Sequence, residues 1–304
     1  MNEWLAFSDQ VARALAGNRP VVALETTVVT HGLPHPDGMR AALQLEADVR
    51  GAGAVPATIG VLDGRVRIGL TRAELERLAA APGVAKLNLS NLAAVLVAGG
   101  PGSTTVAATM FAAHRAGIAV FATGGIGGVH RDAAETGDVS ADLTALSRLP
   151  VAVVCAGAKA ILDLPRTVEM LETLGVPVLG LGTREFPAFY RRDSGLPVDE
   201  SFESVEALAE AVRTHFSLGL PGGVLVANPI PEAEQMPAEL YTRALHEALD
   251  AAAREGVRGR AVTPFLLDRM RAITGGESVR ANLALLRNNA RVAARLAAAL
   301  RRAR

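Results

Sequence analysis

Short apolar runs alternate with amphipathic segments along most of the chain. Runs at 20–28, 118–122 and 151–157 are rich in Val and Ala and border polar or glycine-containing stretches, which predicts buried strands. Between them, apolar positions recur at helical spacing, as in 37–53. Strands that alternate with helices predict an α/β fold built in layers. We expect one domain over residues 1–304, because no stretch poor in apolar residues divides the chain.

Local signals refine this pattern. Residues 8–17 start at a Ser and stop at a Gly, which predicts a first helix, and Asp63-Gly64 predicts the turn of a hairpin. Thr71 and Glu74 form a capping box that opens the next helix. The run 93–100 indicates a strand that leads through a loop into a helix. From 204 onward long helical patterns dominate, so we expect a helical C-terminal cover.

Charge and cysteine content narrow the function classes. Lys plus Arg and Asp plus Glu both total 31, and the basic residues cluster only at the extreme C-terminus. A duplex-binding protein usually carries a basic face, so we expect no nucleic-acid partner. Cys155 is the only cysteine, which excludes an internal disulfide and a cysteine metal cage. A lone Cys in a Val-rich strand is best interpreted as a small core residue.

The chain shows no targeting or membrane signal. Its start lacks the basic segment and long apolar stretch of a secretion signal, and its apolar runs are far shorter than a membrane span. We therefore expect a soluble, cytoplasmic protein without a membrane partner.

Lys159 follows the apolar run 151–157 and has apolar neighbours. Ligands of α/β proteins bind at the carboxyl ends of strands, and desolvation favours the neutral, nucleophilic form of an amine. The alternative is a surface lysine at a helix start, since lysines are usually exposed. The chain has only one other lysine, Lys86, and otherwise uses Arg, which cannot form an imine. This scarcity favours Lys159 as a nucleophile.

Lys86 and Glu25 are further candidates. Lys86 suits a phosphate, with donors from Asn88, Ser90 and Asn91, or is a solvated loop lysine. Glu25 interrupts an apolar run, and a carboxylate inside a buried strand tends to mark a site. The alternative for Glu25 is a strand end that reaches solvent.

The segment 122–143 is rich in glycines, which permit close backbone approach to a ligand. Its spacing fits neither a dinucleotide fingerprint nor a P-loop. Asp138 and Asp142 are hard oxygen ligands that suit Mg²⁺ or Mn²⁺, whereas a loop with Ser140 capping a helix is the structural alternative. The segment 102–110 offers an anion site at a helix start, or ordinary capping by Ser103 or Thr104. The roles of three histidines stay open: His31, His35 and His130.

Several segments together resemble one family. They include ALETTVVTHGLPHP, GSTTVAATM, FATGGIGGVHR, DVSADL, VCAGAKAILD, EFPAFY and ANPIP, and they span roughly 20–294 in order. This set is similar to the pseudouridine-5′-phosphate glycosidases, also called indigoidine synthase A-like proteins. The resemblance implies a three-layer α/β/α core, a homotrimer, and reversible cleavage of pseudouridine 5′-phosphate to uracil and ribose 5-phosphate with a divalent cation, typically Mn²⁺.

The resemblance also implies roles for individual residues. Lys159 would form an imine with the ribose C1′, Glu25 would move protons, and Asp138 would bind the metal. Asn282 matches a family asparagine near the base. The sugar phosphate would be bound by Lys86, Val106, Ser140, Ala141 and Asp142. One departure concerns the phosphate: many relatives carry Ser-Arg-Arg-Asp-Leu where this chain has Asn-Leu-Ser-Asn-Leu at 88–92, so other donors must replace those arginines.

Two other functions compete with this interpretation. A ribokinase-like phosphotransferase would fit the alternating pattern and the glycine-rich loops, but no GAGD-type anion loop with a catalytic Asp is found. A non-catalytic nucleotide-binding protein is equally compatible with zero net charge.

Overall fold

The central feature of the computed structural model, which describes residues 3–33, 36–257 and 262–302, is an 11-stranded sheet. Its order is β1-β4-β3-β2-β7-β8-β11-β9-β10, with β6 pairing β3 and β5 pairing β6. The strands are β1 Leu5–Phe7, β2 Val21–Leu24, β3 Val55–Leu62, β4 Arg65–Ile68, β5 Ala85–Leu87, β6 Gly102–Thr104, β7 Val120–Ala122, β8 Ala152–Cys155, β9 Val178–Leu181, β10 Glu200–Phe202 and β11 Val224–Ala227.

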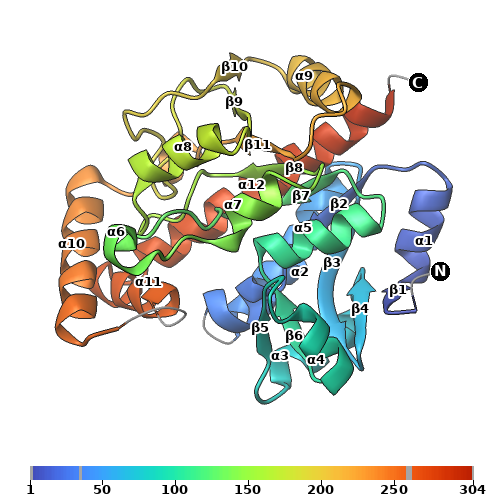
Figure 1. The fold of residues 1–304 in the computed structure, drawn as a ribbon, viewed down its shortest axis with the longest axis horizontal. Helices are drawn as coiled ribbons and strands as arrows, with labels where there is room; N and C mark the ends of the chain where they lie inside the picture. Colours follow the sequence, from blue (N-terminus) through green and yellow to red (C-terminus); the bar gives the residue numbers. More distant parts are fainter. Residues whose placement is uncertain (1–2, 34–35, 258–261, 303–304) are drawn as a thin grey trace.

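Helices lie on both faces of this sheet, as the α/β pattern predicted (Figure 1). They are α1 Asp9–Ala16, α2 Asp37–Gly51, α3 Arg72–Ala80, α4 Leu92–Ala98, α5 Val106–Arg115, α6 Ala133–Thr136, α7 Ala141–Leu146, α8 Leu164–Thr173, α9 Val205–Ser217, α10 Ala238–Arg254, α11 Val262–Ile273 and α12 Glu277–Arg302, with a π-helix η1 Val28–Gly32 and a 3-10 turn η2 Glu232–Glu234. The long helix α12 packs across β2, β7 and β8 between α2 and α9, and α5 and α7 cover the opposite face (Figure 1).

Most sheet pairings are parallel, and this places strand ends at one edge. From β3 through β2, β7, β8, β11 and β9 to β10, every neighbouring pair is parallel. The chain leaves β2 for β3 on one side, whereas β7 leads to β8 on the other. Ligands of α/β sheets bind where the strand order diverges in this way, at the carboxyl ends. The fold therefore prepares a site beyond β2, β7 and β8.

Side-chain caps fix several helix starts where the sequence predicted them. Ser8 accepts from the Val11 amide before α1, and Thr71 and Glu74 form the complete capping box of α3. Ser140 accepts from the Asp142 amide before α7. The hairpin turn is also confirmed, because β3 and β4 pair antiparallel around it.

Three features of the structure differ from what the sequence indicated. The run 93–100 does not form a strand: helix α4 occupies most of it, ending at Gly99 in the left-handed conformation. A short apolar run lacks enough length to separate helix from strand by periodicity. Ser103 and Thr104 do not cap a helix but lie in β6, and α5 starts after Thr105. Helix α11 was not expected at all.

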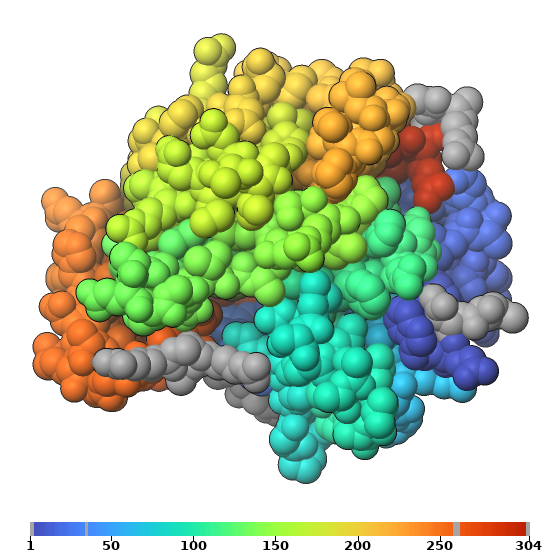
Figure 2. All heavy atoms as spheres, in the orientation of Figure 1, coloured from blue at the N-terminus to red at the C-terminus, as the bar shows by residue number. Residues whose placement is uncertain are grey.

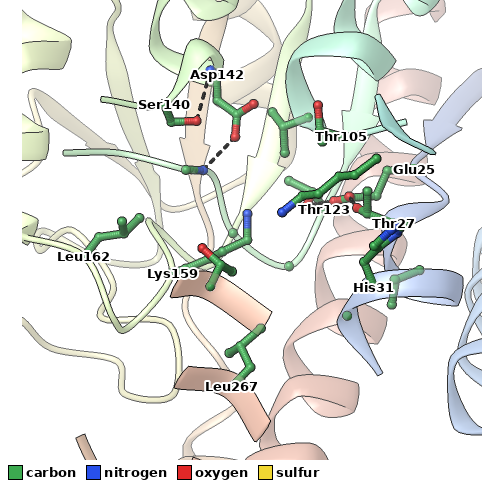
Figure 3. Close-up of a pocket in the computed structure, with 18 of the residues that line it drawn as sticks. Glu25, Thr27, His31, Thr105, Thr123, Ser140, Asp142, Lys159, Leu162 and Leu267 are labelled. Carbon is green, nitrogen blue, oxygen red and sulfur yellow. Dashed lines mark hydrogen bonds between the residues drawn. The ribbon is translucent and has the colours of Figure 1, made fainter. Parts of the chain in front are cut away.

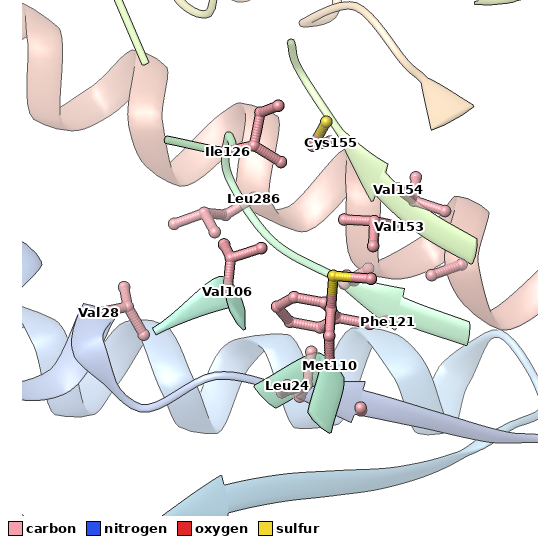
Figure 4. Close-up of a cluster of buried hydrophobic side chains, with 14 of the residues drawn as sticks. Leu24, Val28, Val106, Met110, Phe121, Ile126, Val153, Val154, Cys155 and Leu286 are labelled. Atoms are coloured by element: carbon pink, nitrogen blue, oxygen red, sulfur yellow. The ribbon is translucent and has the colours of Figure 1, made fainter. Parts of the chain in front are cut away.

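Apolar side chains of the central strands and the helices on either face form one core. Leu24, Phe121 and Val153 from the strands meet Met110 of α5 in this core (Figure 4). Cys155 belongs to it, as the sequence indicated: it is fully buried, and burial raises the pKa of its thiol to about 12. None of the helices within the described ranges is long and apolar enough to cross a membrane.

An ion cluster outside the core joins two helices that are far apart in the sequence. Asp48 of α2 is buried, and Arg287 and Arg291 of α12 donate to its carboxylate at 2.8 and 2.7 Å. Burial pushes the pKa of Asp48 upward, but the hydrogen bonds and charges of the two arginines outweigh it, so the pKa lies below its usual value. This cluster stabilises the packing of α12 against α2.

Candidate active site

A cavity of about 370 Å³ opens at the carboxyl ends of β2, β7 and β8. Its size lies within the range of small-molecule sites, roughly 300–1,000 Å³. The residues that the sequence predicted for the site all line it: Glu25, Lys86, Val106, Asp138, Ser140, Ala141, Asp142, Lys159 and Asn282. They come from six segments of the chain, so the fold brings together residues separated by more than 250 positions, as the numbers 25 and 282 show. Their individual roles stay predictions.

Glu25 is the first residue after β2, not an interior strand residue as expected. Its side chain is partly buried and lines the cavity. Thr123, at the end of β7, donates its hydroxyl to one carboxylate oxygen, and Thr27 donates to the other. The carboxylate is thus held from two sides by neutral donors, in an orientation that Figure 3 shows beside Thr27 and Thr123.

Lys159 lies on a loop that the neighbouring strands hold in place. Its backbone amide donates to the Ile126 carbonyl at 3.0 Å, and Ala158 forms a bridge with Ile126. Gly157 allows this path, because its φ is 81° and a Cβ there would lie 2.0 Å from the Pro187 carbonyl oxygen. The lysine side chain points into the space bordered by Glu25 and the Ser140–Asp142 turn (Figure 3).

Asp142 organises the glycine-rich loop and does not offer a free carboxylate. One of its oxygens accepts the Ala107 amide at 2.9 Å and the other accepts the Gly127 amide at 2.8 Å. A Cβ on Gly127 would lie 2.3 Å from the Ser140 hydroxyl oxygen, so only glycine fits at that position. Asp142 therefore ties the starts of α5 and α7 to the loop beyond β7, which gathers backbone amides at the cavity wall.

Lys86 lies on β5 rather than in a loop, and it approaches His31 of η1. Burial, together with the positive charge of Lys86, lowers the pKa of His31, which keeps the imidazole neutral at pH 7. The His31 Nδ1 lies 2.6 Å from the Thr30 hydroxyl. Lys86 and His31 thus bring one charged and one neutral nitrogen group to the same wall.

The asparagines after Lys86 divide between the cavity and the loop. Asn88 lines the cavity. The Asn91 side chain instead stabilises the loop: its oxygen accepts a hydrogen bond from the Asn88 amide, and its nitrogen donates one to the Lys86 carbonyl. Ser90 is exposed and does not line the cavity. Of the three donors expected here, Asn88 is the one positioned to reach a ligand.

The donor set can be tested against a divalent cation. Asp138 lines the cavity with its side chain 36% exposed, and His130 Nε2 lies 3.9 Å from one of its oxygens. Within the described ranges, no group of three or more His, Cys, Asp or Glu side chains is arranged to hold a metal. A hard cation such as Mg²⁺ or Mn²⁺ that keeps most of its waters needs only one or two carboxylates, so Asp138 alone fits that type of binding. His35 lies outside the described residues.

The sequence did not reveal Thr123 or Phe189 as site residues. Thr123 stands directly after a strand adjacent to the one that leads to Lys159, and this position is the signal that could have identified it. Phe189 lines the cavity with a left-handed backbone, φ 63°. That conformation costs a non-glycine residue on the order of 1–3 kcal/mol, and no sequence pattern predicts it.

Comparison with known proteins adds to this geometry. The family described as indigoidine synthase A like protein matches residues 10–299. A protein named pseudouridine-5′-phosphate glycosidase from Methylobacterium nodulans is 56% identical over 300 residues, covering 99% of this chain and 89% of the relative. One of the same name from Jannaschia sp. is 55% identical over 296 residues, covering 97% and 98%.

A solved structure also matches this chain over nearly its whole length. The prealnumycin C-glycosynthase AlnA in complex with ribulose 5-phosphate has a TM-score of 0.92 to this chain at 41% sequence identity. The match covers 99% of this chain and 98% of that protein.

Proposed function

Because this chain belongs to the indigoidine synthase A-like family, we propose that it is an enzyme that cleaves the C–C glycosidic bond of pseudouridine 5′-phosphate. The products are uracil and ribose 5-phosphate. The observation that carries the proposal is the pairing of a lysine and a carboxylate across one cavity, Lys159 beyond β8 and Glu25 beyond β2. Neither a phosphotransferase nor a non-catalytic binding protein is favoured by the relatives' names.

The reaction needs an amine because the bond joins two carbons. An ordinary glycosidase protonates a heteroatom leaving group, but the uracil carbon of pseudouridine has no lone pair to protonate. We propose that the ring oxygen leaves C1′ as it takes a proton, and that the Lys159 amine adds to C1′ and gives up a proton. The nitrogen lone pair then forms C=N as the C1′–uracil bond breaks and the uracil carbon takes a proton. Water hydrolyses the imine and releases ribose 5-phosphate.

Glu25 is the residue placed to move these protons. Its carboxylate lines the cavity, and both of its oxygens accept hydroxyl hydrogen bonds from threonines rather than salt bridges. A carboxylate with neutral partners can take up and return a proton without breaking an ion pair. We assign to Glu25 the delivery of the proton to the ring oxygen and to the uracil carbon.

The phosphate would be bound by Lys86 and nearby donors of the cavity wall. Lys86 supplies the positive charge, and Ser140 with the amides at the start of α7 and at Val106 supplies donors. Asn88 replaces part of what arginines provide in many relatives. Asp142 contributes by holding the Ala107 and Gly127 amides, which fixes the backbone next to these donors.

A divalent cation, Mn²⁺ as the resemblance suggests, would be held by Asp138 through its carboxylate and water. Such a cation supplies orientation and charge balance to an anionic substrate. We assign only the holding role to Asp138.

We further propose a homotrimer and a cytoplasmic location. Helix α4 presents apolar residues to the outside: Val97 is 92% exposed, and Leu89 just before the helix is 40% exposed. Figure 2 shows the region of α3 and α4, in cyan and teal, at the lower edge of the drawn face. Covering such residues with another copy of the chain would remove them from water. Light scattering on the wild type and on Val97→Glu tests this; a monomeric wild type would contradict it. Cell fractionation tests the location.

The decisive experiment for the function has two arms. Uracil release from pseudouridine 5′-phosphate, followed by ultraviolet absorbance, tests the reaction itself. Borohydride added with ribose 5-phosphate should leave a covalent adduct visible by intact mass. Lys159→Arg should abolish the adduct while keeping the charge, and Lys86→Arg, the same change at the other lysine, should keep it under saturating sugar phosphate. An unmodified mass for the wild type would exclude the imine.

A further inference from the structure

A second cavity of about 300 Å³ adjoins the active-site cavity. It lies between η1, α11 and the start of α12. His31 and Gly32 of η1, Leu267 of α11 and Asn282 of α12 line both cavities. These four residues form the boundary between the two spaces, and a rotamer change of the Leu267 or Asn282 side chain there would join them.

The boundary lies on the side of the active site away from the Ser140–Asp142 turn. Figure 3 shows Lys159 between this turn on one side and Leu267 on the other. A substrate whose sugar is attached to Lys159 and whose phosphate reaches Ser140 directs its third part, the base, toward Leu267. Asn282, which the resemblance places near the base, belongs to the same boundary. The base is therefore the part of the substrate next to the second cavity.

The far end of the second cavity reaches the protein surface. Pro264, Asp268 and Arg271 of α11 line it and are exposed. Its inner end is formed by the residues shared with the active site, and its walls include the buried Tyr190. The cavity thus extends from the active site to solvent by a path separate from the exposed rim at Asp138.

Polar side chains in the walls of the second cavity are paired with one another. Arg271 donates to the Asp268 carboxylate at 2.7 Å, and Ser278 hydrogen-bonds to the Tyr190 hydroxyl. The positive charge of Arg271 is thus offset within the wall, whereas Lys86 brings positive charge to the active-site cavity. A phosphate is attracted to the active-site cavity, and a small neutral molecule meets walls in the second cavity that bind it only weakly.

The proposed reaction releases its two products in sequence. Uracil becomes free when its bond to C1′ breaks and the uracil carbon takes a proton, whereas the sugar phosphate stays attached to Lys159 until water hydrolyses the imine. A base that stays beside the imine can form the C–C bond again by the reverse of the same steps. Departure of the base before hydrolysis therefore favours cleavage, and product release limits the turnover of many enzymes.

We propose that the second cavity is the exit passage of the base, which leaves past Leu267 and Val279 while the sugar phosphate remains on Lys159. The proposal rests on the proposed function, because it takes a neutral base as the first product. It assigns a route and not a further binding subsite. Blocking the passage therefore slows the movement of the base and leaves its equilibrium affinity unchanged.

The test blocks the passage without entering the active site. Val279→Trp places a large side chain in the second cavity, and Val279 does not line the active-site cavity. Leu267→Trp narrows the boundary itself and decides if the first variant does not fold. The matched control is Phe265→Trp, because Phe265 lies on α11, is partly buried and lines neither cavity.

Four quantities are measured for each variant with pseudouridine 5′-phosphate or its products. Acid quenching of the first turnover counts all uracil formed, whether bound or free, and so reports C–C cleavage. The steady-state rate reports complete turnover. The inhibition constant of uracil reports its equilibrium affinity, and the rate of borohydride trapping with ribose 5-phosphate reports imine formation.

We expect Val279→Trp to lower the steady-state rate by about tenfold or more, because release of the base becomes the slow step. The rate of the first turnover, the uracil inhibition constant and the trapping rate should stay within about twofold of wild type, and Phe265→Trp should leave all four quantities there. An unchanged steady-state rate would show that the base leaves by another route. A slower first turnover or weaker uracil inhibition would show that the substitution disturbs the active site, and either result would overturn the proposal. Failure of the proposed function has a different signature, since the wild type itself would then release no uracil.

Discussion

Two carboxylates in different parts of the fold have contrasting partners. Asp48, between α2 and α12, accepts hydrogen bonds from two guanidinium groups. Glu25, at the end of β2, accepts from two threonine hydroxyls. Fixed cations lower the pKa of a carboxylate and keep it ionised at neutral pH, whereas threonine hydroxyls orient a carboxylate without forming an ion pair. The difference fits a stabilising role for Asp48 between two helices and the role in proton transfer that we propose for Glu25.

Glu25→Gln should give the largest effect. The amide keeps the size of the side chain but cannot transfer a proton, and general acid–base groups contribute roughly 10²–10⁴-fold to rate. We expect kcat for uracil release to fall by about that factor while the urea midpoint of unfolding stays near the wild-type value. A variant that keeps more than about a tenth of the wild-type kcat would assign proton transfer to another group.

Asp48→Asn should lower the stability of the protein and leave kcat unchanged, the reverse of the result for Glu25→Gln. The amide retains hydrogen bonding but removes the negative charge that Arg287 and Arg291 share. The arginines are about half exposed, 43% and 49%, so water offsets part of the loss. We expect the free energy of unfolding to fall by about 1–3 kcal/mol, measured by urea denaturation, with kcat of the folded enzyme unchanged.

The control for this change is Asp63→Asn. Asp63 pairs with Arg77 at the exposed hairpin turn, and asparagine tolerates its positive φ. The unfolding midpoint of this variant should match the wild type. Equal losses of stability in the two variants would mean that burial of Asp48 does not strengthen its ion pairs.

The same contrast shows which features the sequence can predict. Lys159 and Glu25 were identified because a lysine after an apolar run and a glutamate within one are unusual; the structure then places Glu25 directly after β2 and Lys159 in the loop after β8. The α/β order and the capped helices followed from local patterns that the structure confirms. Helix α4 was missed because seven apolar residues carry no usable period.

Features that depend on long-range contacts were not accessible in this way. The two arginines that bind Asp48 lie more than 230 positions away, at separations of 239 and 243, so no local pattern connects them. Thr123 is an ordinary residue type, and its role comes only from the approach of β7 to β2. Such roles require the register of the sheet, which the sequence alone does not give.

The pH dependence of stability sharpens the account of Asp48. Its pKa is lower in the folded protein than in the unfolded chain, where it is about 3.9. The stabilisation is therefore fully present above that value and is lost as the pH falls through the folded pKa. The difference in unfolding free energy between wild type and Asp48→Asn should be constant from about pH 7 to pH 5 and shrink below about pH 4. A difference that grows toward acid pH would contradict the ion cluster.

Thr123→Val should give the smallest effect on the reaction. Valine fills the same space but removes one of the two hydroxyls that orient Glu25, and the Thr123 carbonyl still accepts from Asn289. With Thr27 still donating, we expect kcat to fall by about tenfold or less and KM to stay near the wild-type value. Thr109→Val is the matched control, because the buried Thr109 hydroxyl has no hydrogen-bond partner in the described part of the chain and should be dispensable. If both substitutions lower kcat equally, the effect comes from packing and Thr123 does not position Glu25.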